Sequence, residues 1–544
     1  MPHVSIVKLT ACAVFALALL TSRARADDPP EVVIGERLFL ETRFAQFFFA
    51  HSNGNVNATL ADGDPVVATL PSPRGPIQGP FAGKSMNCRQ CHLVDDAKDF
   101  SGGGNRSYSD FARRSAIPIR EDGRTLTPRN SPSLVNASLP RKSGFFLHFD
   151  GEFPTIRDLV KGTLTGRNYG WLSNESDAAI QHIANVIRQD DGSGDLAKST
   201  GGAYRAVFKG ENPAIPAAYV LPKNLRIDVM RSTDEQILNA VATLIAIYVN
   251  QLIFSQDENG VFNGSPYDLF LLKNSLPPQQ NPNENPIAYG RRLLAEIQKL
   301  KAPVFVTPAD GTLQLHNQAF AFGAAELAGL KLFLSEPAAA SSGSAGNCIA
   351  CHAPPRFADF IFHNTGAAQE EYDTLHGDGA FSALKIPSQA ERLANAHEFL
   401  PPSAADPGAL GRFISIPDAN DPVRVDLGVW NVIGNPNKPN PQRVIAKVLQ
   451  KPHERRVSLD ALVDRSIALF KTPGLRDLGH SDPYLHTGRM DTIENVVQFY
   501  LRFSALNRAG KVRNADPEIA RIQLEAADVD TLVLFLKSLN EDYE

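Results

Sequence analysis

Cysteine and methionine are both scarce in this chain, which has five Cys and four Met among 544 residues. So few methionines exclude a Met-rich binding groove. Outside the N-terminus, no apolar run reaches the roughly 18 residues that a membrane-spanning helix needs. The formal net charge of -5 gives no concentrated basic surface for nucleic acid. These absences exclude a nucleic-acid-binding protein and predict no membrane span after the N-terminal segment.

The chain is long and of ordinary composition. Its 544 residues suffice for two or three domains, each with its own core. The 39 Gly and 39 Pro are slightly above average usage, which favours long loops without wholesale disorder. Regular strand-type alternation is scarce, whereas helical patterns recur, so the predicted fold class is mainly α.

The N-terminus has the pattern of a secretory signal. Lys8 precedes an apolar stretch from Leu9 to Leu20, and small residues follow around Ala26. The stretch is too short to span a membrane, so we expect residues 1–26 to be a signal peptide cleaved after about Ala26. The mature protein is then expected in the periplasm.

The four cysteines that follow this segment form two tight clusters. One reads Cys-Arg-Gln-Cys-His over residues 88–92, and the other reads Cys-Ile-Ala-Cys-His over residues 348–352. Two disulfides, a redox-active thiol pair or a four-thiolate zinc site could use these cysteines, but none of them requires the adjoining His. The spacing C-x-x-C-H is the attachment site of a c-type haem.

Each motif has the parts that covalent haem attachment needs. Two thiols at this spacing can bond to the two vinyl groups, while the next imidazole reaches the iron. We therefore predict two covalently bound haem c groups. The predicted attachment residues and iron ligands are Cys88, Cys91 and His92 for the first haem and Cys348, Cys351 and His352 for the second.

Three short motifs follow each haem motif in the same order. After the first they are Ser-Pro-Ser-Leu at 131–134, His-Phe-Asp-Gly at 148–151 and Thr-Ile at 155–156. After the second they are Thr-Pro-Gly-Leu at 472–475, His-Thr-Gly at 486–488 and Thr-Ile at 492–493. In both copies the Thr-Ile pair opens a helical pattern. This repetition predicts two c-type cytochrome domains related by duplication.

These motifs divide the mature chain. Residues 27–230 are predicted to form the N-terminal cytochrome c domain, and residues 324–544 the C-terminal one, with an insertion at about 367–465. Residues 231–323 are expected to form a helical connection and a loop rich in Pro and Asn. Within it, the segment 275–304 is expected to be exposed.

Helical spacing of apolar residues predicts three particular helices. The longest covers Glu235 to Leu252, and its apolar character indicates a core helix. A short amphipathic helix is predicted over Ala324 to Leu334, ahead of the second haem motif. A last helix over Asp528 to Leu539 is expected to close the second haem domain.

Taken together, these motifs resemble the bacterial di-haem cytochrome c peroxidases and their relative MauG. The resemblance covers most of the mature chain. The residues that carry it are Ile34 to Phe39, Asn87 to His92, Arg129 to Leu134, Asp150 and Gly151, Ser265 to Asp268, Cys348 to His352, Phe362 to Gly366, Phe470 to Pro473, Pro483 to His486, and Thr492 to Glu494. It implies that the first haem meets hydrogen peroxide or oxygen, and that the second relays electrons from an external donor such as a small redox protein.

The first haem region departs from this family. No His lies between His92 and His148 to cap the first iron, and Tyr108 is nearest the expected place. The aromatic residue between the haems is Trp in the family and Phe149 here, which is much harder to oxidise. The family's distal Gln and Glu correspond by ungapped counting to Leu159 and Tyr169.

A bound peroxide needs a positioned acid–base group, and the family's carboxylate is absent. The candidates for the reactive site are Phe149, Tyr169 and Asp158. Glu152 and Glu175 are alternative carboxylates nearby. For each of these carboxylates, an ordinary surface position is the simpler interpretation.

The resemblance to MauG implies that Tyr500 is the sixth ligand of the second iron. Met490 is the alternative ligand, since Met is a common soft partner of haem iron. A third interpretation makes Tyr500 a core residue whose hydroxyl bonds to the backbone. The family's calcium between the haems is held by an Asn side chain and backbone carbonyls, and the matching positions are Asn130, Ser481 and Pro483.

Three functions remain open at this point. The first is a peroxidase-like or MauG-like oxidoreductase. The second is an electron-transfer cytochrome without its own catalysis, in which the missing distal groups mark a lost reactive pocket. The third is an oxygenase acting on a bulky substrate, suggested by the long loops at 201–345 and 367–465. Retention of two haem units favours the first function.

Overall fold

The computed structural model describes residues 28–70, 77–79, 81–92, 114–210, 215–313, 318–337, 343–451, 453–476 and 478–541. Over these ranges the chain is mainly helical, with two short antiparallel sheets of two strands each, so the predicted fold class is confirmed. Residues 1–26 and Tyr108 lie outside the described residues. None of the described helices is both long and apolar enough to cross a membrane.

The helices in chain order are α1 Pro30–Phe39, α2 Gln46–His51, α3 Ile156–Leu164, α4 Ser176–Gln189, α5 Asp195–Ser199, α6 Tyr204–Lys209, α7 Asp234–Gln251, α8 Pro266–Lys273, α9 Pro286–Lys299, α10 Ala324–Leu334, α11 Ala367–His376, α12 Ala380–Ala383, α13 Gln389–Ala394, α14 Ala396–Phe399, α15 Pro439–Leu449, α16 Leu459–Arg465, α17 Ile493–Arg508, α18 Pro517–Ala520 and α19 Val529–Lys537. The paired strands are β1 Thr69–Leu70 with β2 Ile77–Gln78, and β3 Phe362–His363 with β4 Phe470–Lys471. Two 3-10 helices, η2 Cys88–Gln90 and η6 Cys348–Ala350, hold the haem motifs.

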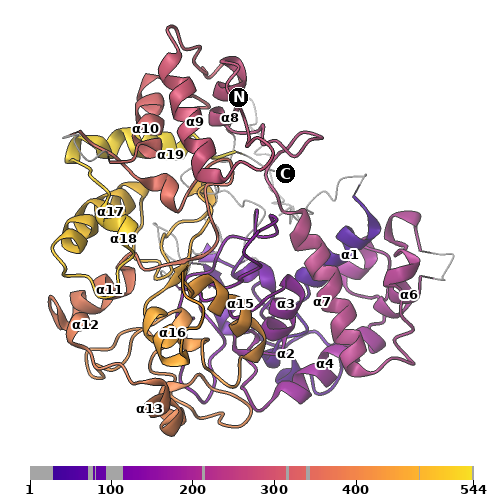
Figure 1. The fold of residues 1–544 in the computed structure, drawn as a ribbon. Coiled ribbons are helices and arrows are strands. Elements are labelled where there is room, and N and C mark those ends of the chain that lie inside the picture. The colour runs from indigo at the N-terminus through magenta and orange to yellow at the C-terminus, as the bar shows by residue number, and fades with distance from the viewer. Residues whose placement is uncertain are drawn as a thin grey trace, which may run out of the picture.

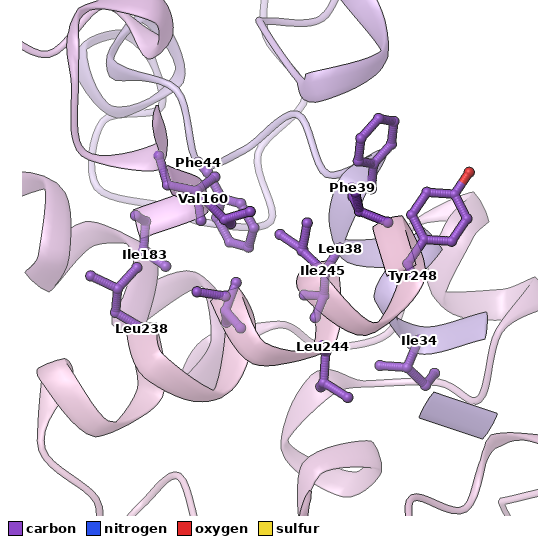
Figure 2. Packing of buried hydrophobic residues seen from close by; sticks show 14 of the residues in the cluster. Ile34, Leu38, Phe39, Phe44, Val160, Ile183, Leu238, Leu244, Ile245 and Tyr248 are labelled. Carbon is purple, nitrogen blue, oxygen red and sulfur yellow. The ribbon is translucent and has the colours of Figure 1, made fainter. Parts of the chain in front are cut away.

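The first hydrophobic core lies around α7, with α1, α3 and α4 packed against it (Figure 1). The predicted bounds of this helix agree with the observed ones to within one residue at each end. Its start is fixed by a capping box between Thr233 and Gln236. Figure 2 shows Leu38 and Phe39 of α1 near Ile245 and Tyr248 of α7, so these apolar faces bury one another.

A second core is built by α8, α9, α10, α17 and α19, at the top and left of Figure 1. α10 has the predicted bounds, and α19 lies within the predicted range. α7 therefore belongs to the first core, whereas α8 and α9 belong to the second. The predicted connection, residues 231–323, divides between the two cores.

The prediction that residues 275–304 are an exposed connection is wrong for its second half. The helix α9 lies there and buries Tyr289, Leu293 and Ile297 in the second core. The Asn285 side chain accepts the amide of Ala288 at 2.9 Å and caps the helix, whose first residue is a proline. Asn and Pro are helix-start residues as well as loop residues, and composition alone did not separate these roles.

Each of the two cores contains one close contact between two helices, and the two contacts are alike. Gly35 in α1 lies so near α7 that a Cβ there would collide with the carbonyl oxygen of Leu244. Gly329 in α10 lies equally near α19, where a Cβ would collide with the carbonyl oxygen of Thr531. The sequences around them are similar, Ile-Gly-Glu-Arg-Leu-Phe and Ala-Gly-Leu-Lys-Leu-Phe. This echo adds to the motifs that suggested two related units.

The repeated loops after the haem motifs follow the same backbone course. Each contains an antiparallel bridge, Leu147 with Phe153 and Tyr484 with Met490. Each has left-handed backbone at two corresponding positions, His148 and Gly151 in the first and Leu485 and Gly488 in the second. Each ends in a Thr whose hydroxyl caps the next helix, Thr155 for α3 and Thr492 for α17. The sequence repetition is therefore a repetition of local structure.

The predicted insertion, residues 367–465, has a hydrophobic core of its own. Its short helices α11 to α16 surround buried side chains that include Phe413 and Trp430. Phe146 and Phe149 from the first repeated loop pack into the same core. The insertion therefore packs against the first repeated loop.

Candidate haem sites

A cavity lined by residues of both units brings the second haem motif together with Tyr500. Cys348, Cys351, His352 and Tyr500 all line it. The turn of η6 fixes the motif, because the amides of Cys351 and His352 both donate to the carbonyl oxygen of Cys348, at 3.2 and 2.8 Å. Both cysteines are free thiols, as are Cys88 and Cys91. The four thiols are therefore available for covalent attachment.

His352 is oriented as an iron ligand would be. Its Nδ1 lies 2.9 Å from the carbonyl oxygen of Phe357, which leaves Nε2 for a metal. Burial lowers the pKa of the imidazole and so favours the neutral form that binds metals.

Tyr500 lies on α17, and its hydroxyl has no hydrogen bond to any residue that the structure describes. That argues against the interpretation in which this hydroxyl bonds to the backbone. Burial, together with the nearby thiols of Cys351 and Cys348, raises the pKa of the phenol. Met490 does not line the described cavity and packs instead with Phe499 and Phe503. The geometry favours Tyr500 over Met490 as a ligand.

The rest of the cavity wall is largely apolar. The side chains include Phe333, Ile493, Val497, Leu532 and Leu536. Two thiols, an imidazole, an unbonded phenol and apolar surfaces together suit a haem, whose macrocycle is apolar and whose iron takes His and Tyr ligands. The residues of this cavity therefore fit the predicted cofactor.

The first haem motif has the same local turn. The amides of Cys91 and His92 donate to the carbonyl oxygen of Cys88, at 3.2 and 3.0 Å. Asn87 caps η2 and also donates to the carbonyl oxygen of Leu40 at 3.0 Å, which ties the motif to the end of α1. Burial and the charge of His148 lower the pKa of His92 to about 4. A hydrogen bond to the backbone of Pro132 acts in the opposite direction and is outweighed. Residues 93–113, which follow the motif, lie outside the described residues.

The structure brings Tyr169 to the first haem motif. Its hydroxyl oxygen lies 3.1 Å from the Sγ of Cys88, and its ring is buried. Burial raises the pKa of this phenol well above its usual value. Asp158, in contrast, lies in the first turn of α3 and is bound to the helix cap Thr155. Its carboxylate accepts the Thr155 hydroxyl at 2.7 Å, and its backbone amide donates to the Thr155 Oγ1 at 3.0 Å.

The two alternative carboxylates are engaged in ion pairs. Glu175 makes a bidentate pair with Arg120, at 2.8 and 2.9 Å. Glu152 contacts Lys438 and lies 3.2 Å from the Nδ1 of His148. Burial alone would raise the pKa of Glu152, but the charge of Lys438 and the bond to His148 hold it well below its usual range. Each of these carboxylates has a structural partner.

Aromatic side chains lie where the two units meet. Phe149 and His486 both line the cavity, and their ring centroids are 6.2 Å apart. His486 stacks on Phe470 with centroids 3.4 Å apart. Phe149 therefore lies at the wall of the cavity that holds the second haem motif, and its place between two haems stays a prediction.

A buried arginine holds this inter-unit loop. Arg129 pairs with Asp150 at 2.6 Å, and it makes a second pair with Asp426 of the insertion at 2.5 Å. Arg114 pairs similarly with Glu371 of the insertion at 2.9 Å. Sequence reasoning missed both carboxylates, because nothing local marks a partner that is hundreds of residues away.

The predicted calcium residues meet at the same junction. The Asn130 amide nitrogen donates to the carbonyl oxygen of Pro483, and its backbone amide donates to the carbonyl oxygen of His486 at 2.7 Å. Ser481 lines the cavity nearby. If the side-chain amide of Asn130 were rotated by half a turn, its Oδ1 would face the carbonyl oxygen of Pro483. Two facing oxygens of this kind would need a cation between them. The residues therefore suit a calcium ion without requiring one.

No family model matches the chain. The cytochrome-c peroxidase IdrP2 of Pseudomonas sp. (strain SCT) is 37% identical over 79 residues, 14% of this chain and 19% of that protein. The cytochrome-c peroxidase IdrP2 of Denitromonas iodatirespirans is 24% identical over 195 residues, 36% of each chain. The alignments thus span a fifth to about a third of these relatives.

Among solved structures, the diheme peroxidase BthA from Burkholderia thailandensis E264 has a TM-score of 0.44 at 15% identity, over 94% of this chain and 86% of that chain. A MauG-like protein associated with microbial copper homeostasis has a TM-score of 0.43 at 15% identity, over 95% of this chain and 90% of that chain. The sequence similarity to two cytochrome-c peroxidases supports the resemblance to the di-haem peroxidase and MauG family.

Proposed function

We propose that this chain is an exported di-haem c-type cytochrome oxidoreductase that reduces hydrogen peroxide or oxygen at its first haem site, with electrons from an external donor entering through the second. The observation that carries the proposal is the convergence of Cys348, Cys351, His352 and Tyr500 on one cavity. The repeated motif at Cys88 and the similarity to two cytochrome-c peroxidases support it further.

The chain's own residues hold and orient the cofactors in this proposal. Bound haem supplies one-electron chemistry that no side chain provides. The carbonyl of Phe357 fixes the ring of His352. Phe149 and His486 bring two aromatic rings to the wall of the second cavity, on the side of the first repeated loop.

A second candidate function is electron transfer without peroxidase activity. It is favoured by one observation: Glu152, Asp158 and Glu175 are all engaged by structural partners. A carboxylate held in an ion pair or a helix cap is a poor donor of protons to a bound peroxide. The role of Asp158 or Tyr169 as an acid–base group therefore stays a prediction.

Expression in the periplasm of a bacterium with a working haem-attachment system tests the proposal. Intact mass after acid-acetone extraction should show two haems on a chain that begins at Asp27. The holoprotein, given a reduced small redox protein, should consume hydrogen peroxide. Two retained haems without peroxide turnover would select the electron-transfer function, and a bare polypeptide mass would refute both functions.

A calcium ion held by Asn130, Ser481 and Pro483 is part of the proposal. The supporting observation is the approach of the Asn130 side chain to the carbonyl of Pro483. Calorimetric titration of the chelator-treated holoprotein with calcium should show one site, and Asn130→Ala should remove it. Equal heats for both proteins would place calcium elsewhere.

A further inference from the structure

Three cationic side chains line the second haem cavity without an anionic partner. They are Arg141, Arg356 and Lys471, and none of them pairs with a carboxylate in the described part of the chain. They come from three separate segments: the loop before the first repeated bridge, the turn after the second haem motif, and strand β4. Their convergence on one wall therefore depends on the tertiary fold.

Backbone contacts fix these side chains in place. The guanidinium of Arg141 donates to the carbonyl oxygens of Phe146 at 3.1 Å and Ala137 at 2.6 Å, and its Nε is buried without a partner. Arg356 donates to the carbonyl oxygen of Pro140. The cations are therefore held at the cavity wall by groups that do not neutralise them.

Lys471 is held by its backbone, whose amide donates to the carbonyl oxygen of Phe149 at 2.7 Å. The negative charge of Asp150 acts on the pKa of Lys471, but the Asp150 carboxylate is already paired with Arg129. Burial and the charge of Arg141 lower the pKa of Lys471 to about 7. Burial and the charge of Arg356 likewise lower the pKa of Arg141 to about 10. A partly buried cluster of one sign is costly unless an anion completes it.

We propose that Arg141, Arg356 and Lys471 form a carboxylate-binding site in this cavity, filled by the propionate groups of the second haem. This inference rests on the proposed function, because that cofactor brings its two carboxylates into the same cavity. Arginine and lysine are suited to this ligand: the guanidinium fork matches a carboxylate, and the ammonium adds a point charge. A free small carboxylate has the same chemistry and is the other source that the experiment separates.

Positive charge beside the macrocycle stabilises ferrous iron relative to ferric iron, which carries one more positive charge. Removing the charge of Lys471 should therefore lower the reduction potential of the second haem. At about 10 Å and an effective dielectric constant of about 20, one charge changes the ferrous-to-ferric equilibrium roughly tenfold. That change corresponds to about 59 mV for a one-electron couple.

The experiment measures the potentials of both haems in the holoprotein by spectroelectrochemistry at pH 6, where Lys471 is protonated and the propionates stay ionised. Lys471→Met should lower the reduction potential of the second haem, by the equivalent of about a tenfold change in the ferrous-to-ferric equilibrium. Lys471→Arg should keep the wild-type potential. Lys385→Met is the matched control, because its side chain is 86% exposed and lies in the insertion. Arg356→Gln should lower the potential in the same direction as Lys471→Met, and it serves as the second variant if Lys471→Met fails to fold.

Intact mass separates the possible failures. A wild-type protein without haem would refute the proposed function. Variants that carry both haems but keep the wild-type second potential would overturn this inference alone.

Adding acetate to the wild-type holoprotein identifies the source of the carboxylate. Propionates already in place predict no response of the second potential to acetate. A wild-type potential that falls as acetate is added, with no response in Lys471→Met, would overturn the assignment to propionates in favour of a free carboxylate ligand.

Discussion

The two repeated loops have the same backbone course but different side chains at corresponding places. Phe149 in the first corresponds to His486 in the second, and Asp150 corresponds to Thr487, counted back from Gly151 and Gly488. Asp150 forms an ion pair with Arg129, whereas the corresponding Thr487 has no charge to pair. His486, at the place of Phe149, stacks on Phe470, and burial lowers the pKa of its imidazole to about 3. The bridge, the left-handed residues and the helix cap preserve the loop, and its side chains are free to differ.

A buried tyrosine next to each haem motif gives a second contrast. The hydroxyl of Tyr169 lies 3.1 Å from the Sγ of Cys88, so it is committed to the edge of the first motif. The hydroxyl of Tyr500 has no partner among the described residues and faces the second cavity. The first phenol therefore has a partner in its own haem motif, whereas the second is available to an iron atom.

The largest expected effect comes from removing one pair of cysteines. Changing Cys88 and Cys91 together to Ala should leave one haem per chain, attached at the second site. Changing Cys348 and Cys351 together should leave one haem at the first site. Intact mass checks both variants, and a pair variant that still carries two haems would break the assignment of sites.

Removing the hydroxyl of Tyr500 should change one haem and spare the other. A phenolate stabilises ferric iron, so Tyr500→Phe should convert the second haem from six-coordinate low-spin to five-coordinate high-spin. Tyr500→Met should raise its potential. Tyr169→Phe is the matched control, and the second haem should keep its wild-type low-spin ferric signal in that variant, because Tyr169 contacts only the first motif. An unaltered spectrum in Tyr500→Phe would move the ligand to Met490.

The smallest expected effects compare the two helix contacts. Gly35→Ala and Gly329→Ala each force a Cβ against a backbone carbonyl, and such overpacking costs about 1–3 kcal/mol. Gly194→Ala is the control, because a Cβ there meets nothing within 4 Å, and its effect should stay within about 0.5 kcal/mol. Thermal midpoints of the holoproteins measure this. Equal thermal midpoints for all three variants would contradict the close helix contacts at Gly35 and Gly329.

Local patterns in the sequence were enough to predict many elements of the fold. Helix bounds followed from apolar spacing and caps, as at α7, and the haem motifs needed only five consecutive residues each. The segment 275–304 failed because Asn285 and Pro286 are typical of both loops and helix starts. Residues 367–465 hold short helices whose core depends on Trp430 and other distant residues, and such helices show little periodicity.

The candidate site was predictable where its residues are close in sequence. Tyr500 came from the resemblance to MauG and not from a local rule. The convergence of Arg141, Arg356 and Lys471, and the anchoring of Arg129 by Asp426, join residues that are far apart in the chain. Tertiary contacts of this kind leave no mark in a single sequence.

The central claim is that one chain holds two haems with unlike axial surroundings, the first open and the second ligated by Tyr500. Electron paramagnetic resonance of the ferric holoprotein, as isolated, tests it most directly. We predict one high-spin and one low-spin signal of equal amount, with only the high-spin signal lost when cyanide is added. Two low-spin signals before cyanide is added would contradict the account, since another side chain would then cap the first iron.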